Sequence, residues 1–133
     1  MCNHIHKEHT IPKEKSGIAW KVFEVIDSKL TSMAAGVGYQ GNYKFPPINK
    51  EWVTWDRKNI GDGFCIIPDF EEACRLLHRW GKNHRYHYCI VEVEYDKAVA
   101  LQMEDNIFTI KEDPFEVLIV KKFRPVKTWE KWD

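Results

Sequence analysis

The chain has 133 residues, of which 44% are hydrophobic. That length suits one domain with a single sizeable core that needs neither disulfides nor a metal for support. Lysine plus arginine and aspartate plus glutamate both number 20, so the formal net charge is zero. This balance excludes a global electrostatic field that would draw the chain to nucleic acid or to an anionic membrane.

The sequence favours a cytoplasmic protein. No apolar run approaches the roughly 18 residues of a membrane-spanning helix, and the opening MCNHIHKEHTIPKEKSG is too polar for a secretory signal. The four cysteines, at positions 2, 65, 74 and 89, include no CxxC pair. We therefore expect reduced thiols, with Cys65 and Cys74 acting as small hydrophobes.

Residues 1–16 are polar and predict a flexible N-terminal segment before a single domain over 17–133. The segment carries side chains that bind zinc or copper when they are brought together: Cys2, His4, His6 and His9. No second ligand pair at a fixed spacing accompanies them. Adventitious metal binding stays open, but we predict no built metal site.

A strand is predicted at 18–26, IAWKVFEVI, from its β-branched and aromatic content. The following TSMAAGVGYQGNYKFPPINK, at 31–50, has three glycines and two adjacent prolines and predicts a long irregular loop. Its GVGYQG matches G-x-G-x-x-G, but prolines follow where a dinucleotide site needs a helix. We interpret it as a flexible loop whose Tyr39, Tyr43 and Phe45 could cover a pocket. EWVTW is a further short strand candidate.

A strand that leads into a helix is the clearest local pattern. GFCII, at 63–67, reads as an apolar strand, and the helix is predicted at 69–80. Asp69 and Glu72 have the spacing of a capping box, and Gly81 supplies a stop signal. Helical spacing puts five apolar residues on one face: Phe70, Ala73, Cys74, Leu77 and Trp80. We expect this face to pack on a sheet.

The C-terminal half alternates apolar and polar residues. YCIVEVEY, AVALQM, NIFTIK and FEVLIVKKF predict four strands, with a turn at Asp96-Lys97 between the first two. Short connections favour antiparallel neighbours over residues 87–123. The predicted fold class is therefore α+β: a single domain with a mostly antiparallel sheet, one main helix packed on it and a long irregular loop.

The order of these elements resembles ADP-ribosyltransferase-type domains. The residues that carry the resemblance are the strand WKVFEVI, a looped middle, GFCII feeding DFEEACRLL, the strand CIVEVEY and the closing FTIKEDPFEVLIVKKF. The chain is also similar to small phage and bacterial proteins of unassigned function that have a Gly-Phe-x-x-Phe-like strand before such a helix. The resemblance covers roughly residues 18–123.

The resemblance implies roles for three residues. Gln102 and Glu104 are similar to the family's Gln-x-Glu pair, in which the glutamate binds ribose and stabilises an oxocarbenium-like transition state. Lys21 stands where the family's first strand has an arginine or histidine for NAD. The family's Ser-Thr-Ser strand motif is absent, because GFCII stands in its place.

Two hypotheses follow. The first is a small binding protein that engages a nucleotide-like ligand or a protein through aromatic residues of the loop and of EWVTW, with Trp52 and Trp55 among them. The second is an ADP-ribosyltransferase or NAD glycohydrolase with Glu104 and Gln102 as catalytic residues and NAD as its cofactor. The candidate ligand-binding residues are Lys21, Tyr39, Tyr43, Trp55 and Arg57. The missing motifs favour the binding protein.

Overall fold

A computed structural model describes residues 4–26, 29–32, 44–45, 51–56, 61–83, 87–104 and 114–132. In chain order its elements are β1 (Gly17–Ile26), β2 (Lys29–Ser32), β3 (Lys44–Phe45), β4 (Val53–Thr54), β5 (Phe64–Ile66), α1 (Phe70–Asn83), β6 (His87–Glu104) and β7 (Phe115–Trp132). All pairings among these strands are antiparallel. The predicted α+β class, with one helix on a mostly antiparallel sheet, is confirmed.

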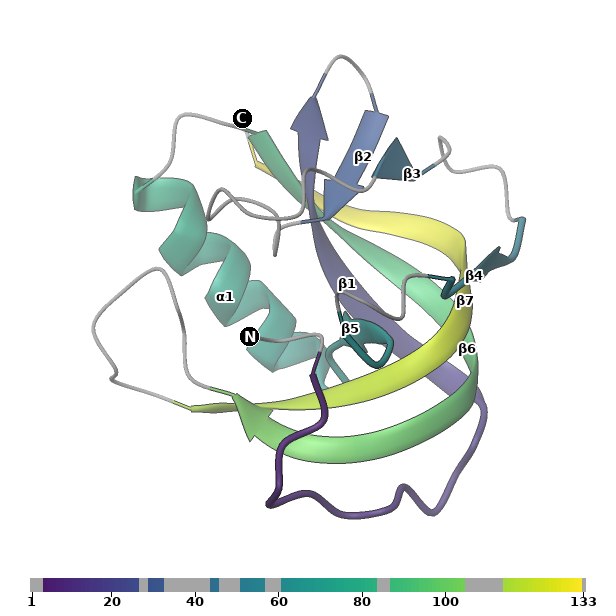
Figure 1. Ribbon diagram of the computed structural model, residues 1–133. Helices are drawn as coiled ribbons and strands as arrows, with labels where there is room; N and C mark the ends of the chain where they lie inside the picture. The colour runs from purple at the N-terminus through teal and green to yellow at the C-terminus, as the bar shows by residue number, and fades with distance from the viewer. Residues whose placement is uncertain are drawn as a thin grey trace.

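The sheet curls back on itself. Its strand order is β3-β2-β1-β6-β7-β4, and β5 also pairs with β7. A backbone bridge closes the curl, because the Trp20 N–H donates to the Ile67 carbonyl at 2.9 Å and the Ile67 N–H donates back at 2.7 Å. Strands β1, β6, β7 and β5 thus form a cycle of neighbours, around which the long β6 and β7 bend (Figure 1).

Two apolar clusters form the core, one on each face of the curled sheet. Neighbouring residues alternate between them as the two-residue period of a strand requires: Val91 belongs to one cluster and Ile90 to the other. The first cluster lies within the curl and includes Phe23, Phe64 and Phe123, whose rings contact one another. The second lies between the sheet and α1.

Helix α1 begins as the sequence predicts and ends later. The Asp69 carboxylate accepts the Glu71 N–H at 3.2 Å, which caps the first turn. Glu72 forms an ion pair with Arg75 in the next turn instead of the predicted return contact. The helix runs through Gly81 to Asn83, so the predicted stop at Gly81 is wrong. The helix buries Ala73, Leu76 and Leu77 against the second cluster.

Strand β5 lies close against β7 because a glycine, Gly63, directly precedes it. A β-carbon on Gly63 would sit 2.6 Å from the Val120 carbonyl oxygen, well inside contact distance. The first residue of the predicted GFCII strand is therefore required to be glycine by the approach of two backbones.

Strand β6 continues through Asp96-Lys97, where the sequence predicted a turn. Lys97 adopts a left-handed backbone with a φ of 58°, its N–H binds the Asp96 carboxylate at 2.8 Å, and the register with β7 shifts between Ala98 and Ala100. A left-handed residue with a register shift is a β-bulge, which bends a strand without reversing it. The predicted strand NIFTIK lies outside the described residues. The predicted loop at 31–50 contains β3, and β2 overlaps its first residues.

The cysteines differ from expectation at one position. Cys65 is disulfide-bonded, whereas Cys74 and Cys89 are free thiols. The prediction of reduced thiols is therefore wrong for Cys65, since sequence spacing alone does not reveal which cysteines meet in space. Cys2 lies outside the described residues. No helix in the described part of the chain is both long enough and apolar enough to cross a membrane.

Candidate functional site

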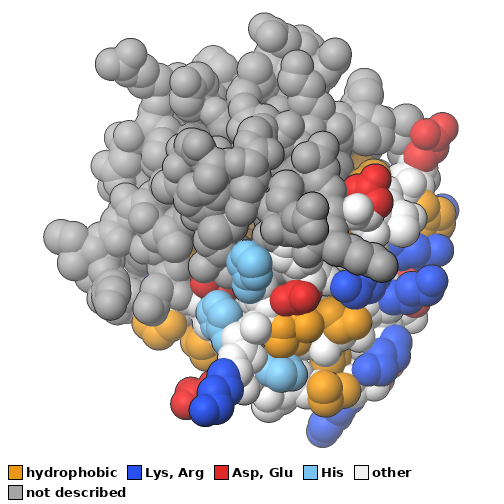
Figure 2. Space-filling model, in the orientation of Figure 1, with side chains coloured by type: hydrophobic (Ala, Val, Ile, Leu, Met, Phe, Trp, Pro, Cys, Tyr) orange, Lys and Arg blue, Asp and Glu red, His pale blue; other side chains and the backbone are white. Residues whose placement is uncertain are grey.

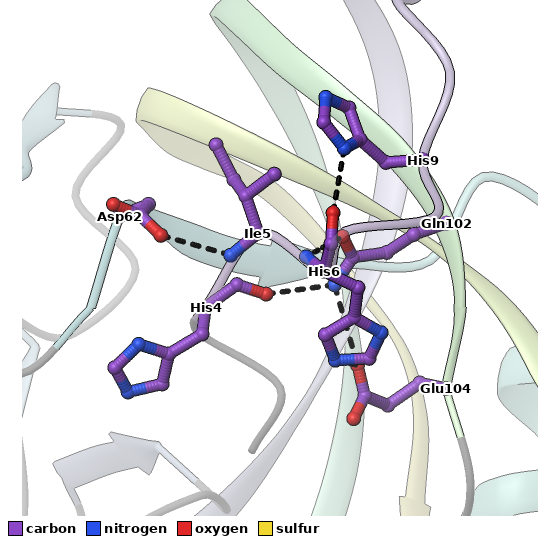
Figure 3. Close-up of polar contacts among 7 residues, drawn as sticks. All are labelled: His4, Ile5, His6, His9, Asp62, Gln102 and Glu104. Atoms are coloured by element: carbon purple, nitrogen blue, oxygen red, sulfur yellow. Dashed lines mark hydrogen bonds and ion pairs between the residues drawn. The ribbon is translucent and has the colours of Figure 1, made fainter.

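Gln102 and Glu104, the predicted catalytic pair, lie side by side near the end of β6 (Figure 3). They are two residues apart on a strand and therefore project from the same face. The Gln102 Nε2 amide donates to Glu104 Oε2 at 3.4 Å. Their exposed fractions are only 4% and 5%. The structure brings this pair together, but in a buried setting.

The start of the chain covers this pair. Gln102 Oε1 accepts the His6 backbone N–H at 2.8 Å, and Gln102 Nε2 donates to the His4 carbonyl at 2.8 Å (Figure 3). The Gln102 amide thus pairs with the backbone of the N-terminal segment as a neighbouring peptide would. His6 Nε2 lies 3.1 Å from Glu104 Oε2.

We call residues 4–10 the N-terminal strap. Its backbone is fixed at both ends: the Ile5 N–H donates to the Asp62 carboxylate at 2.8 Å, and Thr10 and Leu101 exchange backbone hydrogen bonds at 2.9 Å. Figure 2 shows histidine side chains gathered on the face that the strap crosses. The sequence predicted a flexible segment here because it has few apolar residues. Its contacts in the structure are polar ones to residues distant in the chain, and the flexibility stays a prediction.

The polar atoms of the pair face the strap. A carboxylate that stabilises a developing cation must face the ligand that reacts. Here the Glu104 carboxylate is buried and faces His6. A hollow of about 350 Å³ at this edge reaches Gln102, and it is lined by Glu8, His9, Thr10, Leu101, Gln102, Met103 and Glu116. Glu104 does not line it.

Lys21, the predicted NAD contact, lies in the interior of the protein. Its exposed fraction is 6%, and its Nζ donates to the Cys65 carbonyl at 2.8 Å and lies 5.5 Å from the centre of the Phe23 ring. Burial lowers the pKa of this amine from 10.5 to about 8. Among the described residues it contacts neither Gln102 nor Glu104, so the structure does not assemble the predicted NAD site around these three side chains.

Trp55 is partly buried and packs against the core. Its ring meets Phe64 edge-on at 5.0 Å, its Nε1 donates to the Gly61 carbonyl at 3.2 Å, and it packs against the cluster within the curl. These contacts fix the approach to β5, which explains the tryptophan without a ligand. The other predicted ligand-binding residues, Tyr39, Tyr43 and Arg57, lie outside the described residues.

A row of side chains crosses the part of the sheet that α1 leaves open. Ile18 on β1 pairs with Glu94 on β6, and Glu94 pairs with Arg124 on β7. Arg124 donates to both Glu94 oxygens, at 2.8 and 3.1 Å from Nη2, and its guanidinium carbon lies 5.1 Å from the centre of the Trp52 ring. Lys122 Nζ lies 4.7 Å from the same ring centre. Ile18 and Trp52 are 50% and 40% exposed, so both large apolar side chains meet solvent.

Beside this row lies a surface depression of about 440 Å³, which we call the Trp52 hollow. It is lined by Ser16, Gly17, Ile18, Trp52, Glu94, Tyr95 and Asp96. Gly17 leaves room for Tyr95, because a β-carbon there would sit 3.0 Å from the Tyr95 hydroxyl. Burial and, to a smaller extent, the negative charge of Glu14 raise the pKa of Tyr95. Sequence reasoning named Trp52 as a possible anchor but missed the rest, which come from strands far apart in the chain.

No group of three or more His, Cys, Asp or Glu side chains in the described ranges could hold a metal ion. Comparison with protein-family models, with curated proteins and with solved structures found no match. Function must therefore be inferred from the geometry of this chain.

Proposed function

We propose that the chain is a binding protein that engages a protein partner through the open sheet face around the Trp52 hollow. The observation that carries this is the exposure of Trp52 and Ile18, which both line a hollow of about 440 Å³. Exposed aromatic and aliphatic side chains at a concave surface are the usual anchors of protein interfaces. The proposal keeps the aromatic anchor predicted from the sequence but assigns it to Trp52 instead of Trp55.

Charge favours a protein over a nucleotide-like ligand. The hollow is lined by the carboxylates of Glu94 and Asp96. Arg124 neutralises Glu94, but Asp96 has no ion pair with any described residue. A phosphate that entered the hollow would meet this uncompensated negative charge at short range. A nucleotide-like ligand is therefore the weaker choice for this surface.

An ADP-ribosyltransferase or NAD glycohydrolase that uses Glu104 is the second candidate. The proximity of Gln102 and Glu104, joined by a hydrogen bond of 3.4 Å, favours it. The strap counts against it, because His4 and His6 occupy the polar atoms of both side chains. Catalysis would require the strap to leave first, and NAD would then be the cofactor.

A displayed library of random peptides, selected on the full chain, tests the binding proposal. We expect selected peptides to lose most of their affinity for Trp52→Ala and Ile18→Ser, because each change removes an exposed anchor. The matched control is Met103→Ala, which removes another exposed large side chain, 52% accessible, at a different edge. Peptides that bind the wild type, Trp52→Ala and Ile18→Ser equally would contradict the proposed surface.

A further inference from the structure

We infer that the Trp52 hollow receives the guanidinium group of an arginine side chain from the partner. This rests on the proposed function and goes beyond it, because it names the chemical group that the surface recognises. Three features of the hollow support it: an unused hydroxyl, an unpaired carboxylate and an apolar wall.

The Tyr95 hydroxyl is the unused polar group. Tyr95 is 92% buried, from its relative exposure of 8%, and it lines the hollow. Its hydroxyl forms no hydrogen bond with another described residue and is not among the fully enclosed polar atoms. A buried side chain with an accessible and unpartnered hydroxyl can accept a hydrogen bond from a ligand.

The Asp96 carboxylate supplies the charge. One of its oxygens accepts the Lys97 N–H, and no ion pair with a described residue neutralises it. The charged side chains in the lining of the hollow are Glu94 and Asp96, and Arg124 forms an ion pair with Glu94. This leaves Asp96 as a net negative charge in the lining. A cationic ligand is therefore favoured.

The apolar wall selects a cation with a hydrophobic stem. Ile18 and Trp52 offer exposed apolar surface along which the methylene groups of an arginine can lie. A guanidinium group offers five donors in one plane, which suits a carboxylate and a hydroxyl together, whereas an ammonium is more strongly hydrated. Arginine therefore fits the hollow better than lysine.

The test uses N-acetyl-L-arginine methylamide as the probe. The control is N-acetyl-L-citrulline methylamide, which has a similar shape but no charge. Each is titrated into the full chain while the backbone amides of Gly17, Ile18 and Asp96 and the indole N–H of Trp52 are followed by NMR. We expect the arginine probe to shift these signals. The citrulline probe should bind at least about tenfold more weakly, since charge-assisted hydrogen bonds are the stronger ones.

Two conservative variants assign the contacts. Asp96→Asn keeps the oxygen that accepts the Lys97 N–H and loses the charge. Tyr95→Phe removes a hydroxyl that forms no hydrogen bond with a described residue. Each should weaken the arginine probe severalfold, whereas Glu116→Gln, at the other hollow, should leave it unchanged. Equal binding of both probes, or no shift at these four signals, would overturn the inference. Selected peptides that lack arginine but lose affinity for Trp52→Ala would also overturn this inference. They would leave the proposed function intact.

Discussion

His6 Nε2 lies 3.1 Å from Glu104 Oε2, so the beginning of the chain is fastened to the end of β6. The neighbouring Gln102 strengthens this link by accepting the His6 N–H and donating to the His4 carbonyl. Side chains that resemble a catalytic pair in the sequence therefore hold a segment with little apolar surface of its own.

The strap should depend on Gln102. Changing Gln102→Leu keeps a similar volume but leaves the His6 N–H and the His4 carbonyl without their partners. We expect a loss of about 1–3 kcal/mol in the free energy of unfolding, the usual cost of such groups. Urea denaturation measures it, and hydrogen exchange at the His6 amide should become faster. Met103→Leu, at an exposed neighbouring position, is the control. Unchanged exchange at His6 would show that the strap is held by other contacts.

Lys21 should make stability rise with pH. Its pKa is about 8 in the folded chain against an ordinary 10.5, so between these values the unfolded chain binds more protons. The free energy of unfolding therefore increases as pH rises through this window, by about 3 kcal/mol for this group. Below the window the amine is charged in both states, and its burial destabilises the folded chain.

Lys21→Met removes this effect and keeps an unbranched side chain. We expect the variant to be more stable than the wild type near pH 7 and the difference to shrink toward pH 10, in chemical denaturation at both values. Comparing the variant with the wild type at the same pH removes the contribution of all other titrating groups. A stability difference that does not change with pH would contradict a lowered Lys21 pKa.

Leu77 should anchor α1 to the sheet. Its exposed fraction is 1%, and it belongs to the cluster between helix and sheet. Leu77→Ala should lower the free energy of unfolding by about 2–5 kcal/mol, through lost burial and the cavity left behind. His78→Ala, on the exposed side of the same helix, should change it little. A loss for Leu77→Ala no larger than that of His78→Ala would place the wrong face of α1 against the sheet.

Cysteine alkylation should distinguish the three described cysteines. In denaturant without reductant, Cys74 and Cys89 should react with iodoacetamide, whereas Cys65 should react only after reduction, because it is disulfide-bonded. Peptide mass spectrometry of the full chain reads out each site. Alkylation of Cys65 before reduction would support the thiol state expected from the sequence.

The sequence predicts features that depend on neighbouring residues. β-branched and aromatic content locates β1, an apolar run locates β5, and the side chain of Asp69 marks the start of α1. It fails where distant residues decide the outcome. The strap is fixed by Gln102, nearly 100 positions away, and β6 passes through Asp96-Lys97 because β7 pairs with both halves of it.

The candidate site was harder to predict than the fold. Trp52 and Trp55 belong to the same short EWVTW segment, yet Trp52 faces the open side of the sheet and Trp55 packs into the core. The carboxylates, tyrosine and glycine of the Trp52 hollow come from strands whose register is set only when the sheet closes. Local sequence patterns do not predict the register between strands that are distant in the chain.

Nicotinamide release from NAD, measured by HPLC with the full chain, tests most directly whether this protein binds or catalyses. Because Glu104 is buried beneath the strap, we predict no nicotinamide release above the buffer control. Glu104→Gln should weaken the contact with His6 and leave nicotinamide release unchanged. The amide keeps the size of the side chain and loses the charge that would stabilise an oxocarbenium ion. Robust release by the wild type that Glu104→Gln abolishes would contradict the binding role and establish the enzyme.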